Sequence, residues 1–291
     1  TGTDAAVALR RAYRRQLAAI ALRDLDSADP AAVMPSVGRW LADLAGAAVD
    51  AALAVSRATL AEREGPAVDR VDLAVIGMGK CGARELNYIS DVDVVFVHEL
   101  LDPGPDAAGE AGADGADGEA SDAVDGTRAA VLAAELAAGI GRVIQAAAPE
   151  PGLWEVDANL RPEGKDGALS RTLDSHAEYY RRWAHGWEFQ ALLKARPIAG
   201  SADLGARYLE RIWPRVWESS AREGFVDSVR AMRSRVVSFG KVRQAKRSRR
   251  AMPTTATTRP TSSWPRTPTP SAAAAPGPAP RRRPHRWSRR G

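Results

Sequence analysis

The chain has 291 residues, 45% hydrophobic and 26% charged, which is enough for one large domain or two small ones. It contains no run of about 18 apolar residues and no basic region followed by an apolar core, so we expect neither a membrane span nor a secretory signal. The net charge of +5 is uneven, because residues 241–291 hold 14 of the 41 Lys and Arg residues and no Asp or Glu. The remaining 27 basic and 36 acidic residues give an acidic body, which argues against a nucleic-acid-binding function.

The single cysteine, Cys81, excludes an internal disulfide and fits a reducing, cytoplasmic location. Because the chain begins at Thr1 without an initiator methionine, we expect a fragment or a processed piece of a longer protein. Together these features predict a cytoplasmic protein whose basic residues are concentrated at one end.

Two amphipathic helices are predicted before the first strand. Apolar residues recur at helical spacing over residues 3–25 and again over 33–63, where Gly65 and Pro66 end the second pattern. We expect residues 1–66 to form a helical prelude that packs on the unit that follows.

Residues 67–200 read as the domain that contains the candidate catalytic residues given below, with alternating strands and helices. A run rich in β-branched residues predicts a buried strand over 71–76, and a glycine turn follows it. The later predicted elements are a helical turn near 84–87, strands over 91–97 and 154–160, and helices over 127–147 (capped by Thr127), 174–184 and 186–196. The predicted fold class is α/β, a small mixed sheet flanked by helices and followed by a helical region.

Two segments are predicted to be disordered. Residues 102–126 are almost entirely Asp, Gly, Ala, Glu and Pro, which predicts a disordered acidic loop. Between the two disordered segments, helical patterns over 201–217 and 222–239 predict a truncated helical region over 201–240. Residues 241–291 have almost no aliphatic side chains and predict a disordered basic tail rich in Pro and Arg.

The glycine turn carries the first candidate chemistry. Gly77, Gly79 and Gly82 allow a tight turn that brings backbone N–H groups close to a phosphate. The spacing matches neither the P-loop nor the dinucleotide-binding fingerprint. Lys80 could neutralise a phosphate, or it could be an exposed lysine of the turn.

Two carboxylates follow the turn. Asp91 and Asp93 stand two positions apart on a predicted strand, so their side chains point to the same side. Such carboxylates repel each other unless a cation lies between them, and Mg²⁺ prefers oxygen ligands. The third predicted strand adds Glu155 and Asp157, which could complete a two-metal site. The alternative is that Asp91 caps the turn and Asp93 is exposed at a sheet edge.

Other reactive residue types are interpreted as structural. Cys81 has no paired His or second Cys, which favours a small turn residue over a nucleophile. The histidines lack metal-ligand spacing, and four tryptophans fall at i, i+4 on predicted helices, which usually means core packing. These residues are His98, His176, His185, Trp183, Trp187, Trp213 and Trp217.

Three segments, taken in order, resemble the bifunctional glutamine synthetase adenylyltransferase/adenylyl-removing enzymes, a family of the nucleotidyltransferase superfamily. The segments are Gly77 to Asp93, Glu155 to Gly164, and Trp187 to Arg196. The resemblance covers about residues 1–237, and the Leu86-Asn87-Tyr88 sequence is more like the adenylyl-removing domain than the adenylylating one.

The resemblance implies a Mg²⁺-dependent enzyme that handles ATP or ADP and inorganic phosphate. It assigns catalysis and metal binding to Asp91, Asp93 and Asp157, and places the following residues near the phosphates: Gly77, Gly79, Lys80, Ser90 and Arg161. The implied reaction is phosphorolytic removal of AMP from a tyrosine of glutamine synthetase, while the family's other domain adds AMP from ATP. Glutamine synthetase and a PII-type signal protein are the implied partners, without a membrane or nucleic acid.

Two departures from the family keep alternatives open. Asn159 stands where many members have Arg, which removes one phosphate-contacting charge. The family's usual continuation does not follow Val237, so the tail resembles translation of a GC-rich gene in a shifted frame. Translating the encoding DNA in the other two frames tests this reading against that of a basic arm for an anionic partner. The chain could therefore be a fragment that binds glutamine synthetase or a PII-type regulator without turnover, or a nucleotidyltransferase with another acceptor.

Overall fold

The computed structural model describes residues 2–101, 124–221 and 223–234. The basic tail predicted over 241–291, and the acidic loop predicted over 102–126 except its last three residues, lie outside these ranges. The residues in these three ranges form one compact unit.

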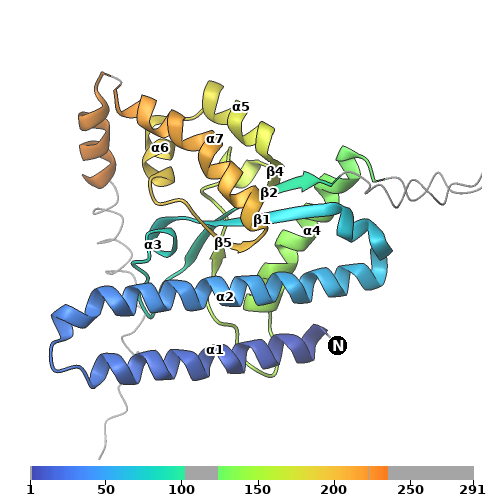
Figure 1. The fold of residues 1–291 in the computed structure, drawn as a ribbon, viewed down its shortest axis with the longest axis vertical. Helices are drawn as coiled ribbons and strands as arrows, with labels where there is room; N and C mark the ends of the chain where they lie inside the picture. The colour runs from blue at the N-terminus through green and yellow to red at the C-terminus, as the bar shows by residue number, and fades with distance from the viewer. Residues whose placement is uncertain (1, 102–123, 222, 235–291) are drawn as a thin grey trace, which may run out of the picture. The chain divides into compact units, whose positions relative to one another are not determined.

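Two long helices lie side by side at the N-terminal end (Figure 1). Helix α1 spans Gly2–Leu25 and α2 spans Pro30–Glu64. The carboxylate of Asp29 accepts two backbone amide hydrogen bonds at the start of α2, and Gly65 ends the helix with a φ of 62°. A 3₁₀ turn, η1, Gly65–Arg70, leads into the first strand. Both predicted helices are confirmed.

The sequence predicts no membrane span, yet one described stretch, Pro30–Arg70, is long and apolar enough by length and composition to cross a membrane. In its most apolar window, 44% is buried inside the protein. Leu41, Val49 and Leu53 of this stretch belong to the hydrophobic core shared with the sheet. These three apolar side chains are therefore already used in packing against the rest of the chain.

A five-stranded mixed sheet forms the centre of the unit. Strand β1, Val71–Gly77, pairs antiparallel with β2, Val92–Leu100, and on its other side with β5, Arg196–Gly200. Two short strands, β3, Val156–Asp157, and β4, Ser170–Thr172, pair parallel with β2. The predicted α/β fold with a small mixed sheet flanked by helices is confirmed.

Helices cover both faces of the sheet. Successive side chains of a strand point to opposite faces, and each face has its own hydrophobic cluster. One set packs with α2 and with α4, Gly126–Gln145: Leu73, Val75, Val94 and Phe96. The alternate set packs on the opposite face: Ala74, Ile76, Val95 and Val97. Three helices cover that face: α5, Leu173–Arg182, α6, Gly186–Leu192, and α7, Ala202–Ser220.

The helical prelude is not a separate body. Ile20 of α1, Leu41 of α2 and Val75 of β1 share one cluster of buried residues. The C-terminal limit of residues 67–200 coincides with the end of β5, and the described helix over 225–234 falls inside the predicted helical region. The domain limits themselves stay predictions.

Several element boundaries were predicted wrongly. The helical turn expected near 84–87 is instead α3, Gly79–Gly82, after which Arg84 has a φ of 58°. Asp125, and not Thr127, caps α4, because its carboxylate accepts the amide hydrogen bond of Arg128.

The third strand is also shorter than the predicted range of 154–160. It comprises the two residues of β3, because Asp157 Oδ1 accepts the amide of Asn159 at 2.7 Å and the chain turns away. The polar turn expected after it contains a 3₁₀ turn, η3, Gly164–Asp166. Strands β4 and β5 were not predicted.

The prediction of buried tryptophans was wrong for three of the four. Trp183, Trp213 and Trp217 are 68%, 44% and 64% exposed. Spacing at i, i+4 places two side chains on one helix face, but it does not say whether another element covers that face. Buried Tyr180, Tyr208 and Ile212 fill the cluster beneath α5 and α7 instead.

Candidate functional site

The glycine turn leaves β1 and closes against the neighbouring strand. The amide of Met78 donates to the carbonyl oxygen of Asp93 at 2.8 Å. Gly79 has a φ of 51°, and a Cβ at this position would lie 2.3 Å from Asp93 Oδ2. The backbone of the turn therefore lies directly beside a carboxylate, at a distance that excludes any side chain.

The end of the turn is buried against β5. A Cβ at Gly82 would lie 1.9 Å from the carbonyl oxygen of Lys194 and 2.4 Å from that of Gly77. Arg196 donates from Nη2 to the carbonyl oxygen of Cys81 at 3.0 Å, and from Nε to that of Gly82 at 3.1 Å. Sequence reasoning did not assign a role to Arg196, because local spacing gives no sign that β5 pairs with β1.

Three aspartates lie near one another at the start of β2. Asp93 of β2 is directly opposite Asp157 of β3 in parallel register, so their side chains share one face of the sheet. Asp91 directly precedes β2, although it was predicted to lie on the strand. Its Oδ1 accepts the hydroxyl of Ser90 at 3.4 Å.

Asp93 carries the electrostatic effect of this arrangement. The side chain is half-buried. Burial, together with the charges of Asp91 and Asp157, raises the pKa of Asp93 to about 6, and Lys80 opposes the shift. In such surroundings, a nearby cation would stabilise the ionised form of the carboxylate.

The donor set suits Mg²⁺, which prefers carboxylate oxygens. Among the described residues, however, no three His, Cys, Asp or Glu side chains form a group that could hold a metal ion as they stand. Asp157 uses one oxygen to accept the Asn159 amide. The three carboxylates are therefore ligands of the type that Mg²⁺ prefers, but they do not converge on one point. Mg²⁺ binding stays a prediction.

Two side chains predicted to contact phosphate already have hydrogen-bond partners within the protein. Lys80 is exposed, and its Nζ donates to Asn87 Oδ1 at 3.3 Å. Arg161 donates to three carbonyl oxygens of residues 158–167 at 2.9 to 3.1 Å, so its guanidinium holds its own loop together. Gly77 ends β1, where a Cβ would lie 2.7 Å from Ile198 Cγ2. The phosphate contacts of these residues stay predictions.

Cys81 is buried in the glycine turn, and burial raises the pKa of its thiol to about 11. The thiol is therefore protonated at neutral pH, which agrees with a structural role. His98 and His176 are also buried, and His98 Nδ1 lies 2.8 Å from Ser170 Oγ. Neither belongs to a metal-binding group within the described ranges.

A model of the glutamate-ammonia ligase adenylyltransferase family matches residues 2–211. The chain belongs to this family. The match contains all three motif segments, from Gly77 to Arg196, so the resemblance drawn from them is confirmed. Within this adenylyltransferase family member, the glycine turn and the three aspartates form the candidate site.

Three relatives from bacteria are each named bifunctional glutamine synthetase adenylyltransferase/adenylyl-removing enzyme. The protein of Leifsonia xyli subsp. xyli is 53% identical over 239 residues, covering 80% of this chain and 22% of the relative. Those of Streptomyces coelicolor and Cutibacterium acnes are 49% and 48% identical, each covering 79% of this chain and 21% of the relative. The chain therefore spans about a fifth of the length of these curated relatives.

Proposed function

We propose that this chain carries a nucleotidyl-transfer centre that acts on glutamine synthetase. The observation that carries the proposal is the set of three aspartates, Asp91, Asp93 and Asp157, beside a glycine turn whose backbone touches Asp93. The names of the relatives supply the protein substrate and the adenylyl group. A PII-type signal protein is a further proposed partner, and the bacterial cytoplasm is the proposed location.

The proposed reaction is phosphorolytic removal of AMP from an adenylylated tyrosine. An oxygen of inorganic phosphate attacks the phosphorus of the AMP group and forms a new P–O bond. The bond between that phosphorus and the tyrosine oxygen breaks, ADP leaves, and the tyrosine oxygen regains a proton. Catalysis of such a transfer consists mainly of positioning and charge neutralisation.

The residues of the site divide these tasks. Backbone N–H groups of the turn from Gly77 to Gly82 orient a phosphate, and Lys80 supplies positive charge. Asp91, Asp93 and Asp157 would hold Mg²⁺, which when bound supplies charge neutralisation at phosphate oxygens. Between the two directions of the family's chemistry, the Leu86-Asn87-Tyr88 sequence favours removal of AMP over its addition.

A fragment that binds glutamine synthetase without turnover is the second candidate. The three carboxylates do not converge on one point, and the chain covers about a fifth of its relatives' length. Both observations are compatible with a chain that keeps the docking surface and lacks catalysis.

One assay separates the candidates. The full chain is incubated with AMP-modified glutamine synthetase, Mg²⁺ and phosphate, and ADP is measured. We expect ADP release to fall at least about a hundredfold in Asp93→Asn. The control Asp174→Asn alters an aspartate on α5 whose side chain is 91% exposed, and it should retain release.

The other outcomes are equally informative. Release that is equal in Asp93→Asn and Asp174→Asn would contradict the proposed site. Absence of release together with measurable binding would support the docking fragment. Incorporation of labelled AMP from ATP into unmodified glutamine synthetase would reverse the proposed direction.

A further inference from the structure

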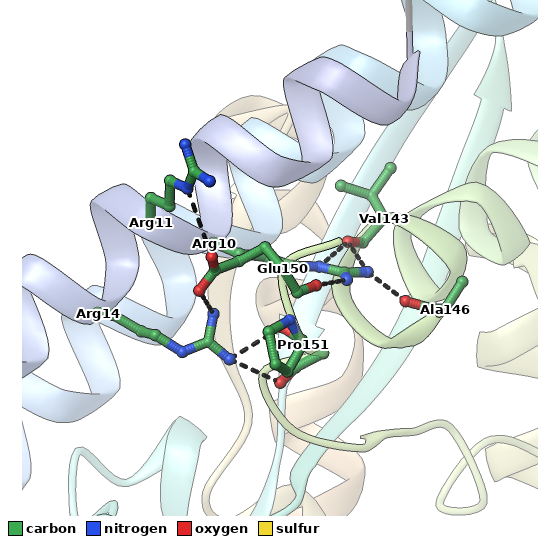
Figure 2. A network of polar contacts seen from close by, with 8 residues as sticks. Arg10, Arg11, Arg14, Val143, Ala146, Glu150 and Pro151 are labelled. Atoms are coloured by element: carbon green, nitrogen blue, oxygen red, sulfur yellow. Dashed lines mark hydrogen bonds and ion pairs between the residues drawn. The ribbon is translucent and has the colours of Figure 1, made fainter. Parts of the chain in front are cut away.

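Arg10 of α1 is buried, with 1% of its surface exposed, and its guanidinium lies among carbonyl oxygens at the C-terminal end of α4 (Figure 2). Nε and Nη2 donate to the carbonyl oxygen of Val143 at 3.0 and 2.8 Å, and Nη2 also donates to that of Ala146 at 2.8 Å. Nη1 donates to the carbonyl oxygen of Glu150 at 2.7 Å. The last carbonyls of a helix lack intrahelical partners and carry partial negative charge, which compensates a buried cation.

The next turn of α1 contacts the residues that follow α4. Arg14 donates from Nη1 to Glu150 Oε1 at 2.7 Å, and from Nη2 to the carbonyl oxygens of Pro151 and Gly152 at 2.8 and 3.0 Å (Figure 2). The ring of Tyr13 meets that of Trp154 edge-on, with centroids 6.4 Å apart. Consecutive residues of α1 therefore hold residues 150–154 from one side.

The segment held by α1 leads directly into the third aspartate. The carbonyl oxygen of Glu155 accepts the amide of Val92 at 2.9 Å, and β3 then pairs with β2 so that Asp157 lies opposite Asp93. Strand β3 has two residues, which is too few for its own ladder to fix its position. The placement of Asp157 therefore depends on what holds the residues before it.

We propose that α1 sets the position of Asp157, with Arg10 and Arg14 as positioning residues that act through residues 150–155. The importance of this role for catalysis rests on the proposed function of the three aspartates. The two arginines contact neither the glycine turn nor the aspartates in the hydrogen bonds that the structure shows. Their effect passes through the backbone of the segment that carries Asp157.

The test uses Arg14, because its side chain is 36% exposed and Arg14→Ala is expected to fold. The matched control is Arg57→Ala on α2. Arg57 also donates to two main-chain carbonyl oxygens, those of Val68 and Val71 at 2.7 and 2.9 Å, but it lies by the start of β1, at the opposite end of the strand from the turn. Arg14→Lys serves as the conservative variant that should restore part of the function.

The first measurement is amide hydrogen exchange in the full chain. Arg14→Ala should speed exchange of the Val92 and Asn159 amides about tenfold, because both bond to the segment from Glu155 to Asp157. Arg57→Ala should leave these two amides unchanged. Equal exchange in the two variants would overturn the inference.

The second measurement is the affinity for Mn²⁺ alone, by calorimetry or electron paramagnetic resonance. Arg14→Ala should weaken binding about tenfold, and this effect should disappear when Asp157→Asn is already present. An unchanged affinity, or an effect that persists without Asp157, would overturn the link to Asp157. If the wild-type chain binds no Mn²⁺ through Asp93, the proposed function fails, and hydrogen exchange then decides on its own whether α1 positions β3.

Discussion

Asp93 and Asp157 face each other across neighbouring strands, but the chain supports them in opposite ways. Asp93 lies on a nine-residue strand, and its carbonyl and carboxylate both adjoin a turn that is close in sequence. Asp157 lies on a two-residue strand whose approach is held by Arg10 and Arg14, more than 130 residues away. One half of the site is built by local backbone contacts and the other by long-range side-chain contacts. The two halves should therefore fail under different substitutions.

The largest effect is expected in the local half. Gly82→Ala should lower the free energy of unfolding by about 4 kcal/mol or more, because the new Cβ would meet two carbonyl oxygens at 1.9 and 2.4 Å. Urea unfolding of the full chain measures this change. The control is Gly126→Ala at the start of α4, where no heavy atom lies within 4 Å of the added Cβ and a change within about 1 kcal/mol is expected. Equal stability of the two variants would show that the turn can shift its backbone.

The long-range half is tested by Arg10→Met. This substitution keeps an apolar stem but removes the donors that satisfy the carbonyl oxygens of Val143, Ala146 and Glu150. We expect a loss of about 3 kcal/mol in unfolding free energy. Arg11→Ala on the same helix is the control, since Arg11 is 68% exposed and touches Glu150 at 3.4 Å, and it should change stability by less than about 0.5 kcal/mol. If Arg10→Met lost as little unfolding free energy as Arg11→Ala, the proposed difference between the local and the long-range half of the site would be contradicted.

Acid should also weaken the packing behind β2, at a histidine that belongs to neither half of the site. Burial lowers the pKa of His176 from 6.5 to about 4, and its Nε2 lies 3.3 Å from the carbonyl oxygen of Phe96. Below pH 6.5 the unfolded chain binds a proton that the folded chain resists, so this contribution to stability is complete above pH 6.5 and is lost as pH falls towards 4. The loss should be roughly 3 kcal/mol.

Unfolding curves at pH 7 and pH 4.5 measure this loss, and His176→Gln should show a shallower dependence on pH than the wild type. Equal slopes in the two proteins would contradict the assignment to His176. The comparison between variants at each pH removes the contribution of the carboxylates that titrate over the same range.

The smallest effect is expected at Lys194, where the backbone and the side chain make separate contacts. The carbonyl oxygen of Lys194 limits space at Gly82, whereas its ammonium pairs with Glu85 at 2.8 Å with both side chains largely exposed, at 45% and 63%. Lys194→Ala should therefore change the unfolding free energy by less than about 0.5 kcal/mol. A change as large as that of Gly82→Ala would mean that the side chain, and not the backbone, supports the turn.

The difference between the two halves also explains what could be predicted from the sequence. The turn from Gly77 to Gly82 and the strands on either side of it show their pattern within a short stretch, so the position of Asp93 was foreseeable. Residue spacing alone gave Asp157 as a carboxylate on a later strand, and the family resemblance joined it to the others. Neither source could show that β3 would shrink to two residues, because Asn159 turns the chain there.

Elements that depend on distant partners were missed. Strand β5 contains Pro197 and an exposed Gly200, and it becomes a strand because it pairs with β1 about 120 residues earlier. Arg196, which braces the turn, was overlooked for the same reason. The exposed Trp183 and Trp217 show the converse, because helical periodicity identifies a face without identifying what covers it.

Three of the hydrogen bonds that α1 makes beyond α4 use main-chain carbonyl oxygens, at residues 150, 151 and 152, which every residue type supplies. The carboxylate of Glu150 and the ring of Trp154 also meet α1, so these two positions depend on residue type. The three main-chain hydrogen bonds therefore constrain the length of the segment before β3 whatever its composition. Inserting one residue between Gly152 and Val156 would place Val156 where Asp157 now stands and turn the carboxylate to the other face of the sheet. The number of residues in this loop is thus a requirement of the site, in addition to the identity of Glu150 and Trp154.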